Sequence, residues 1–87
     1  MLGYTVLIQH LGGSEYKFDS KGRIHLLVHL TKWEKCTILI DKKTKRYILI
    51  TGIGRPKQKK CVYYDPWRLI SFIKQLRVSA NQVGPNR

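Results

Sequence analysis

The clearest pattern along the chain is a period-two alternation in residues 23–30. One side of this segment carries Ile24, Leu26, Val28 and Leu30. The other side carries Arg23, His25, Leu27 and His29. Because successive side chains of a strand point to opposite faces of its sheet, this alternation predicts a strand. We expect one face of that strand to cover a core and the other to meet solvent or a partner.

The residues before this strand predict two more extended segments. Residues 4–11 are rich in β-branched, aromatic and aliphatic side chains, and a Gly-Gly-Ser tripeptide follows them, so we expect a first strand there. Tyr16 and Phe18 then alternate with charged residues and predict a short second strand. That strand would end at residues 19–22, which have the composition of a turn.

The middle of the chain has the pattern of an antiparallel hairpin. Residues 36–41 and 46–51 are both rich in strand-forming side chains, and the polar residues 42–45 connect them. A loop rich in Gly, Pro and Lys follows over residues 52–60. Residues 61–64 predict a last short strand.

The C-terminal part predicts a helix from Pro66 to about Ala80. Asp65 can accept hydrogen bonds from the first backbone N–H groups of that helix, and proline is tolerated at its first position. The apolar stripe of the helix consists of Leu69, Phe72, Ile73, Leu76 and Ala80. The fold class we expect is α+β, with an antiparallel sheet of four to five strands followed by one amphipathic helix packed on one face. Residues 1–80 would form a single domain and residues 81–87 a flexible tail.

Composition excludes several classes of protein. The length of 87 residues fits one domain, and a hydrophobic fraction of 43% is too high for a disordered chain. No apolar run approaches the roughly 20 residues that a membrane-spanning helix needs. The amino terminus lacks the basic flank and the cleavage pattern of a signal peptide. We therefore expect an intracellular protein, in the cytoplasm, nucleus or nucleoid, that is not secreted and does not bind a membrane.

The cysteines and histidines carry little chemistry. Cys36 and Cys61 are too few for a disulfide framework, so we interpret them as reduced apolar residues, with a single bridge between them as the alternative. His25 and His29 lie on the same face of the predicted strand but roughly 13 Å apart, at about 3.3 Å per residue. One metal ion cannot bridge that distance, and we expect neither a metal nor a cofactor.

The charge of the chain points to its partner. The formal net charge is +12, from 17 Lys and Arg against 5 Asp and Glu. Ten of the basic residues fall between positions 32 and 60, where Glu34 and Asp41 are the only acids. Dense positive charge that acids do not neutralise is typical of surfaces that bind phosphate backbones. The candidate phosphate contacts are Lys32, Lys35, Lys42, Lys43, Lys45, Arg46, Arg55, Lys57, Lys59 and Lys60.

Aromatic residues interleave with these charges. Trp33 directly follows Lys32, Tyr47 directly follows Arg46, and Tyr63 comes three residues after Lys60, and unpaired bases stack on such rings. Trp33 falls in a short polar connector, whereas the exposed face of residues 46–51 cannot be assigned from the sequence. Our main hypothesis is a non-enzymatic domain that binds single-stranded DNA or RNA through residues 42–46 and 55–60, with aromatic stacking.

Three alternatives are open at this point. The first is an architectural or ribosome-associated protein that binds duplex or structured RNA by its shape. The second is an adaptor for an acidic protein partner, which could add a strand to an exposed sheet edge. The third is a small magnesium-dependent nuclease, in which Asp41, followed by Lys42 and Lys43, and an upstream Asp19 would hold the ion.

A resemblance adds to the main hypothesis. Residues 21–30 (KGRIHLLVHL), 36–51 and 60–76 (KCVYYDPWRLISFIKQL) resemble the Whirly, transcriptional positive coactivator and Pur-type single-stranded nucleic-acid-binding domains. These families combine a twisted antiparallel sheet with a C-terminal helix. The resemblance spans residues 21–76, about two thirds of the chain. It implies a homodimer in which the helices over residues 66–80 pair and the sheets hold a single strand.

Overall fold

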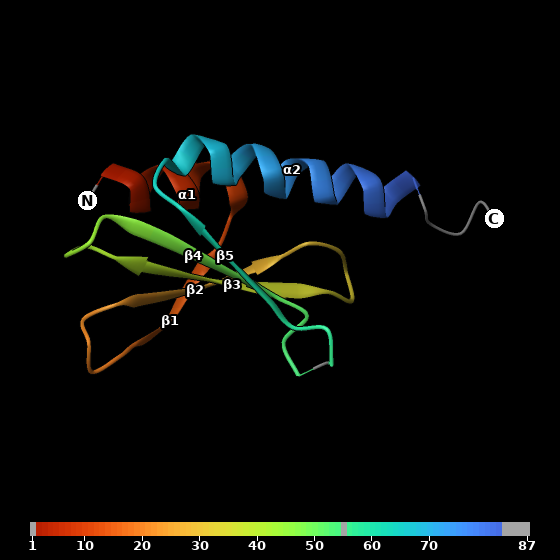
Figure 1. Ribbon diagram of the computed structural model, residues 1–87. Helices are drawn as coiled ribbons and strands as arrows, with labels where there is room; N and C mark the ends of the chain where they lie inside the picture. Colours follow the sequence, from red (N-terminus) through yellow and green to blue (C-terminus); the bar gives the residue numbers. More distant parts are fainter. Residues whose placement is uncertain (1, 55, 83–87) are drawn as a thin grey trace.

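The computed structural model describes residues 2–54 and 56–82. Their elements are α1 (Leu2–Leu11), β1 (Ser14–Phe18), β2 (Ile24–His29), β3 (Lys35–Asp41), β4 (Arg46–Thr51), β5 (Lys59–Tyr63) and α2 (Pro66–Gln82). The five strands form one antiparallel sheet in the order β1-β2-β3-β4-β5. Both helices lie on the same face of this sheet (Figure 1). The predicted α+β class, with a C-terminal helix on one face of an antiparallel sheet, is confirmed.

The prediction of a strand over residues 4–11 is wrong, because α1 occupies them. Val6, Leu7 and Leu11 are buried, and Leu7 and Leu11 are one helical turn apart. Gly12 has a φ of 70°, and its N–H donates to the carbonyl of Ile8 at 2.9 Å, which is a left-handed helix C-cap. The glycine that we took as the end of a strand therefore ends a helix.

The other predicted elements are present, with shifted bounds. The expected arm around Tyr16 and Phe18 is β1, and β4 spans the predicted residues 46–51. The last strand, β5, begins at Lys59 rather than at residue 61, so it includes the end of the predicted loop. The helix α2 continues through residues 81 and 82, which we had assigned to the tail, while residues 83–87 lie outside the described residues.

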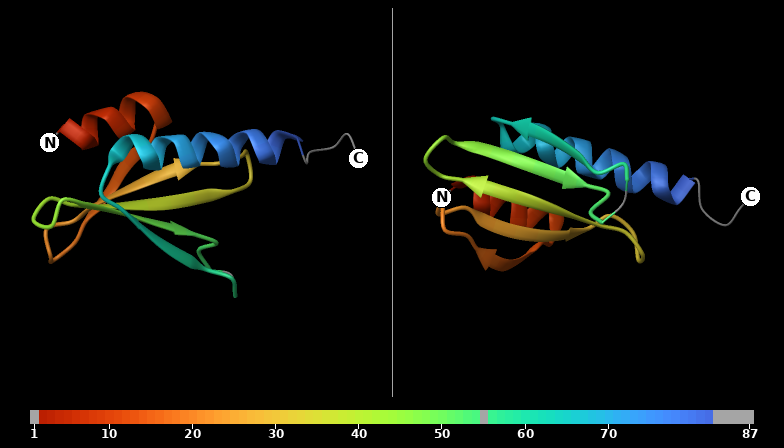
Figure 2. Two further views of the ribbon diagram at one scale, coloured as in Figure 1. Left: turned by 45° about the horizontal axis from the view of Figure 1, so that its top comes forward. Right: turned by 60° about the horizontal axis from the view of Figure 1, so that its bottom comes forward.

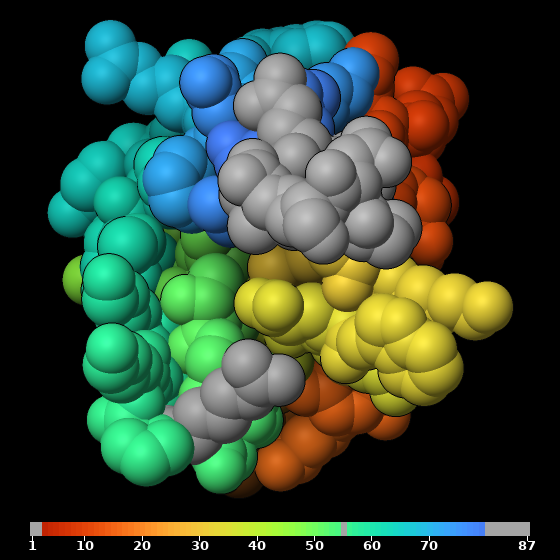
Figure 3. Space-filling model, turned by 90° about the vertical axis from the view of Figure 1, so that its right-hand side faces the viewer, coloured from red at the N-terminus to blue at the C-terminus, as the bar shows by residue number. Residues whose placement is uncertain are grey.

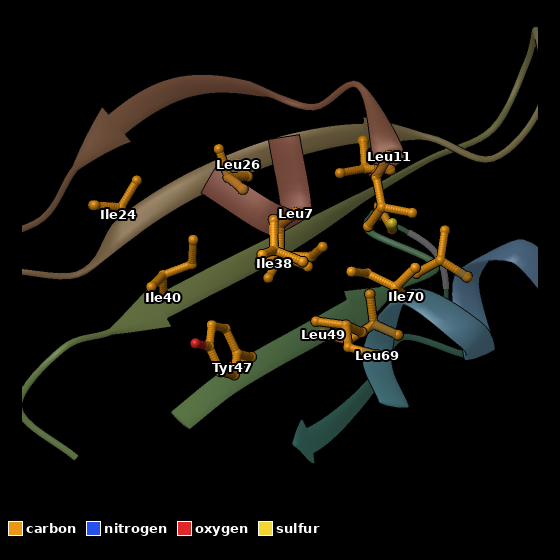
Figure 4. Close-up of a cluster of buried hydrophobic side chains, with 14 residues drawn as sticks. Leu7, Leu11, Ile24, Leu26, Ile38, Ile40, Tyr47, Leu49, Leu69 and Ile70 are labelled. Carbon is orange, nitrogen blue, oxygen red and sulfur yellow. The ribbon is translucent and has the colours of Figure 1, made fainter. Parts of the chain in front are cut away.

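The core lies between the sheet and the two helices (Figure 4). The alternation in β2 is realised as predicted, since Ile24, Leu26 and Val28 are buried on the helix side. From α2, Leu69, Ile70 and Ile73 pack onto the same cluster. The first turn of α2 is capped by Asp65, whose carboxylate accepts a hydrogen bond from the backbone N–H of Trp67 at 3.0 Å.

Arg77 fastens α2 to two other elements. Its guanidinium donates to the carbonyl of Leu11 at the end of α1, at 2.8 Å, and to the carbonyl of His29 at the end of β2, at 2.9 and 3.1 Å. Leu11 is the last residue of α1, where carbonyls lack partners within the helix, and His29 is the last residue of β2. One cation therefore satisfies backbone acceptors on both neighbours of the helix.

We expect Arg77→Met to lower the free energy of unfolding by about 2 kcal/mol, because charged hydrogen bonds to two backbone carbonyls are lost. Urea denaturation measures the change. The matched control is Arg68→Met on the same helix, where the side chain is exposed and makes no side-chain hydrogen bond with the described residues. That variant should differ from the parent by less than about 0.5 kcal/mol. An equal loss in both variants would contradict the fastening role.

The sheet has two distinct ends (Figure 2). The turns over residues 19–23 and 42–45 form what we call the hairpin end. The connections over residues 30–34, 52–54 and 56–58 form the loop end. The face of the sheet opposite the helices extends from one end to the other, and no described element covers it. We call it the open face.

Candidate nucleic-acid interface

The open face is apolar across its middle. Residues that pair directly across an antiparallel sheet share a face, so the register assigns its members. They include His25 and Leu27 of β2, Lys35, Thr37 and Leu39 of β3, Arg46, Ile48 and Ile50 of β4, and Lys60 and Val62 of β5. Leu39 and Thr37 are only 5% and 3% exposed although no helix lies over them. Their neighbours on this face must therefore shield them from water.

Tyr16 provides part of that shielding. The register of β1 shifts between Glu15 and Lys17, and this β-bulge lets the Tyr16 ring reach across β2. Its hydroxyl is 3.1 Å from the hydroxyl of Thr37 on β3, and its ring lies edge-on to His25 at 5.9 Å. The ring itself stays 53% exposed. Tyr16 is thus an aromatic residue of the open face that our list of stacking candidates missed.

The hairpin end presents a cluster of lysines on a hydrogen-bonded turn. The carboxylate of Asp41 accepts hydrogen bonds from the backbone N–H groups of Lys43 and Thr44, at 3.1 and 3.2 Å. These bonds, that of Thr44 above all, hold the pKa of Asp41 below its usual range. The chain then turns through Lys45, which has a φ of 56°. The side chains of Lys42, Lys43 and Lys45 are exposed at the tip.

The loop end presents Trp33. A Thr31 turn holds the connector, because the Thr31 hydroxyl accepts hydrogen bonds from the N–H groups of Trp33 and Glu34 at 3.1 and 3.0 Å. The Trp33 side chain is 83% exposed, the largest value among the exposed large apolar residues. The ammonium of Lys32 lies 5.7 Å from the centre of its ring, within reach of a cation–π contact. The ring of Trp33, which falls in the predicted polar connector, is therefore open to solvent.

A hollow of about 290 Å³ lies beside Trp33. Its lining residues are Leu27, Trp33, Glu34, Lys35, Gly52 and Ile53. The β2–β3 connection and the beginning of the β4–β5 loop form its two sides, and Figure 3 shows these yellow and green segments next to each other at the loop end. We call this site the Trp33 hollow.

A larger groove of about 780 Å³ lies on the helix side of the same end. There β4 and β5 slope away from α2, as the left view of Figure 2 shows. Its walls include Leu30, Leu49, Pro56, Lys57, Lys59, Cys61, Phe72 and Leu76. Lys57 and Lys59 therefore line the helix side, whereas Lys60 belongs to the open face with Ile50.

The predicted basic contacts consequently fall into separate groups. Lys32, Lys35 and Lys60 lie at or near the loop end, and the lysines of residues 42–45 lie at the opposite end of β3 and β4. Arg46 pairs with Asp41 on the open face, and its Nε donates to the Thr44 hydroxyl at 3.0 Å. Arg55 lies outside the described residues.

Two of the predicted stacking residues are placed wrongly for that role. Tyr47 is only 4% exposed and packs in the core beneath α1, and burial raises the pKa of its hydroxyl. Tyr63 pairs with Tyr47 on the helix side, where its ring centre is 6.1 Å from that of Phe72. Successive side chains of β4 point to opposite faces of the sheet. Tyr47 therefore points toward the helices, and Ile48 points toward the open face.

The two acids of the nuclease alternative, Asp19 and Asp41, accept hydrogen bonds within turns. Asp19 accepts hydrogen bonds from the backbone N–H groups of Lys21 and Arg23, from the Arg23 side chain at 2.8 Å and from His25 at 2.9 Å. The hydrogen bond with His25, followed by that with the Arg23 backbone, holds the pKa of Asp19 well below its usual range. Asp41 is engaged by its own turn. Within residues 2–54 and 56–82, no group of three or more His, Cys, Asp or Glu is placed to hold a metal ion.

The alternative of a disulfide between Cys36 and Cys61 is wrong. Cys36 is on β3 and Cys61 on β5, with β4 between them, and both thiols are free. Cys36 is fully buried, and burial raises the pKa of its thiol to about 11. Cys61 is exposed at the wall of the helix-side groove.

Comparison of the chain with models of protein families, with curated proteins and with solved structures gives no match. In the part of the chain that the structure describes, neither helix is both long and apolar enough to cross a membrane. Our hypothesis about the function therefore rests on the geometry of the open face and its two basic ends.

Proposed function

We propose that this chain is a non-enzymatic domain that binds single-stranded nucleic acid on the open face of its sheet. The observation that carries the proposal is the exposed Trp33 ring beside a hollow at the edge of an apolar, helix-free sheet face. Lysines border this face at both ends. Bases that are not paired bury their rings against such a surface while basic side chains contact the phosphates.

Single strands fit this surface better than duplexes do. A duplex hides the faces of its bases and offers mainly phosphates and groove edges to a protein. It would leave Trp33, Tyr16 and the apolar middle of the open face without a partner. The alternative of an architectural or ribosome-associated protein that binds duplex or structured RNA therefore explains the lysines. It does not explain the aromatic and apolar residues among them.

The remaining features of the proposal come from the resemblance to the Whirly, coactivator and Pur-type domains. A homodimer through α2 would have to use Phe72 and Val78, which are 39% and 54% exposed, because Leu69 and Ile73 are buried within the chain's own core. Sedimentation with and without a bound oligonucleotide tests this pairing. An intracellular location agrees with two unpaired thiols, one of which is exposed.

We expect Trp33→Ala to weaken binding to single-stranded DNA or RNA by about tenfold, because one stacked base is lost. Binding to duplex DNA should change by less than about twofold, since a duplex does not stack on the ring. Fluorescence anisotropy with labelled oligonucleotides of equal length measures both affinities. The matched control is Trp67→Ala, which removes a 52% exposed tryptophan from the helix side. Equal losses for single strands and duplex would argue against stacking.

A further inference from the structure

Two exposed apolar side chains line the Trp33 hollow. Trp33, in the β2–β3 connection, is 83% exposed, and Ile53, in the β4–β5 loop, is 49% exposed. Gly52 brings Ile53 to this position through a φ of 68°, and a Cβ there would lie 3.1 Å from the carbonyl oxygen of Lys57. A flat ring that entered the hollow would find the exposed indole and Ile53 as apolar contacts. Proteins hold single splayed bases by stacking them on such aromatic rings.

Glu34 gives the hollow a polar group that the fold does not use. The carboxylates of the other four acids accept hydrogen bonds: Glu15 from Tyr4, Asp65 from the Trp67 backbone, and Asp19 and Asp41 within their turns. Among the described residues, the Glu34 carboxylate has no hydrogen bond and no ion pair. Glu34 lies in the most basic part of the sequence and lines both the Trp33 hollow and the helix-side groove, and a carboxylate at this place weakens phosphate binding.

Lys35, the next residue, lines the same hollow and belongs to the open face. The lining of the hollow thus includes a carboxylate acceptor and an ammonium donor, together with the apolar Trp33 and Ile53. Guanine matches this pair of groups. Its N1–H and N2–H groups can both donate to one carboxylate, while O6 and N7 on the adjoining edge accept from a lysine. Thymine and uracil present one N–H donor, and adenine and cytosine present one amino group.

We infer that the Trp33 hollow is a base-selective pocket that prefers an unpaired guanine, with Glu34 and Lys35 reading its edge. This inference rests on the proposed function, because it assumes that a single strand lies on the open face. It adds that the affinity for a single strand depends on which base of that strand occupies the hollow. The contacts inferred for this pocket are with the base alone, so we expect the same preference in DNA and RNA.

The test uses the full chain and short single strands of thymidine or uridine that carry one central guanine, inosine, adenine or cytosine. The guanine strand should bind about tenfold more tightly than the uniform strand, as expected for one two-bond contact to a base. Inosine, which lacks the 2-amino group, should fall between them. Glu34→Gln should reduce the guanine preference to less than about twofold while it strengthens binding to the uniform strand, because a negative charge near the phosphates is removed. Glu15→Gln, with the same change in net charge, should keep the preference.

The outcomes separate the two proposals. If no single strand binds, the proposed function fails and the pocket fails with it. If all strands bind equally, or if Glu34→Gln changes every affinity by the same factor, the pocket is wrong and the proposed function stands. A direct readout is the fluorescence of Trp33 in a Trp67→Phe background, which should be quenched more strongly by the guanine strand than by the uniform strand at saturation.

Discussion

Replacing Lys42, Lys43 and Lys45 together with glutamine is expected to weaken the binding of a long single strand by about 100-fold at 0.1 M salt. Each phosphate contact on a single strand contributes about 0.7 to the slope of log K against log salt concentration, so three contacts contribute about 2. The loss should be the same for every base sequence, because lysines on phosphates carry no sequence information. Anisotropy titrations at several salt concentrations measure both the affinity and the slope.

The separation of the two basic ends makes this effect depend on the length of the strand. The hairpin end and the Trp33 hollow lie at opposite ends of β3 and β4, and six residues of strand span about 20 Å. A dinucleotide that occupies the hollow cannot also reach the tip of the hairpin, whereas an oligonucleotide of about twelve nucleotides can. The triple substitution should therefore affect only the longer strand. Glutamine at Lys32, Lys35 and Lys60, near the loop end, should weaken both lengths.

The control for charge is the pair Arg68→Gln and Lys74→Gln on α2. Both side chains are exposed, but they lie on the helix layer, away from the open face. Their removal lowers the net charge by two and should leave the salt slope almost unchanged. If the α2 pair flattens the slope as much per charge as the hairpin lysines do, binding is a property of the net charge alone, and the open-face site is wrong.

The sequence predicted the sheet more accurately than the N-terminal helix, for a physical reason. The alternation in residues 23–30 reports a strand with one buried face, and that pattern has no helical equivalent. Helix α1 packs on the sheet and on α2 at once, so its apolar residues are not confined to one side. Residues 2–11 therefore show little periodicity. A short apolar run of this kind is compatible with a buried strand or a buried helix. The helix C-cap at Gly12 was the available signal.

The charged part of the candidate site could be predicted from composition, but its aromatic part could not. Exposed lysines follow from their number and from the scarcity of acids. The choice between Tyr47 and Ile48 as the outward face of β4 depends on which side the helices cover, and this is a tertiary property. Tyr16 reaches the open face through a β-bulge that no local pattern announces. The Trp33 hollow depends on contact between two connections that are about 20 residues apart in the sequence.

The core that supports the open face should be unusually sensitive at Gly3. This residue of α1 lies directly on the ring of Tyr47, and an alanine methyl group there would overlap the Tyr47 hydroxyl and lie 2.6 Å from its Cζ. Tyr47 is 4% exposed and has little room to move. In an ordinary helix, Gly→Ala stabilises by about 0.5–1 kcal/mol. We expect Gly3→Ala to destabilise this protein instead, by about 2 kcal/mol, because overpacking outweighs helix propensity.

A double-mutant cycle separates these two contributions. Tyr47→Leu shortens the side chain beneath Gly3 and creates space, at a cost of its own from the lost ring. In that background Gly3→Ala should no longer destabilise, and its effect on the free energy of unfolding should change sign. The expected coupling between the two positions is therefore about 2 kcal/mol or more, measured by urea denaturation of the four proteins. Additive effects would mean that α1 does not rest on Tyr47, and the inward orientation of that ring, which turns Ile48 and Ile50 toward the nucleic acid, would then have to be revised.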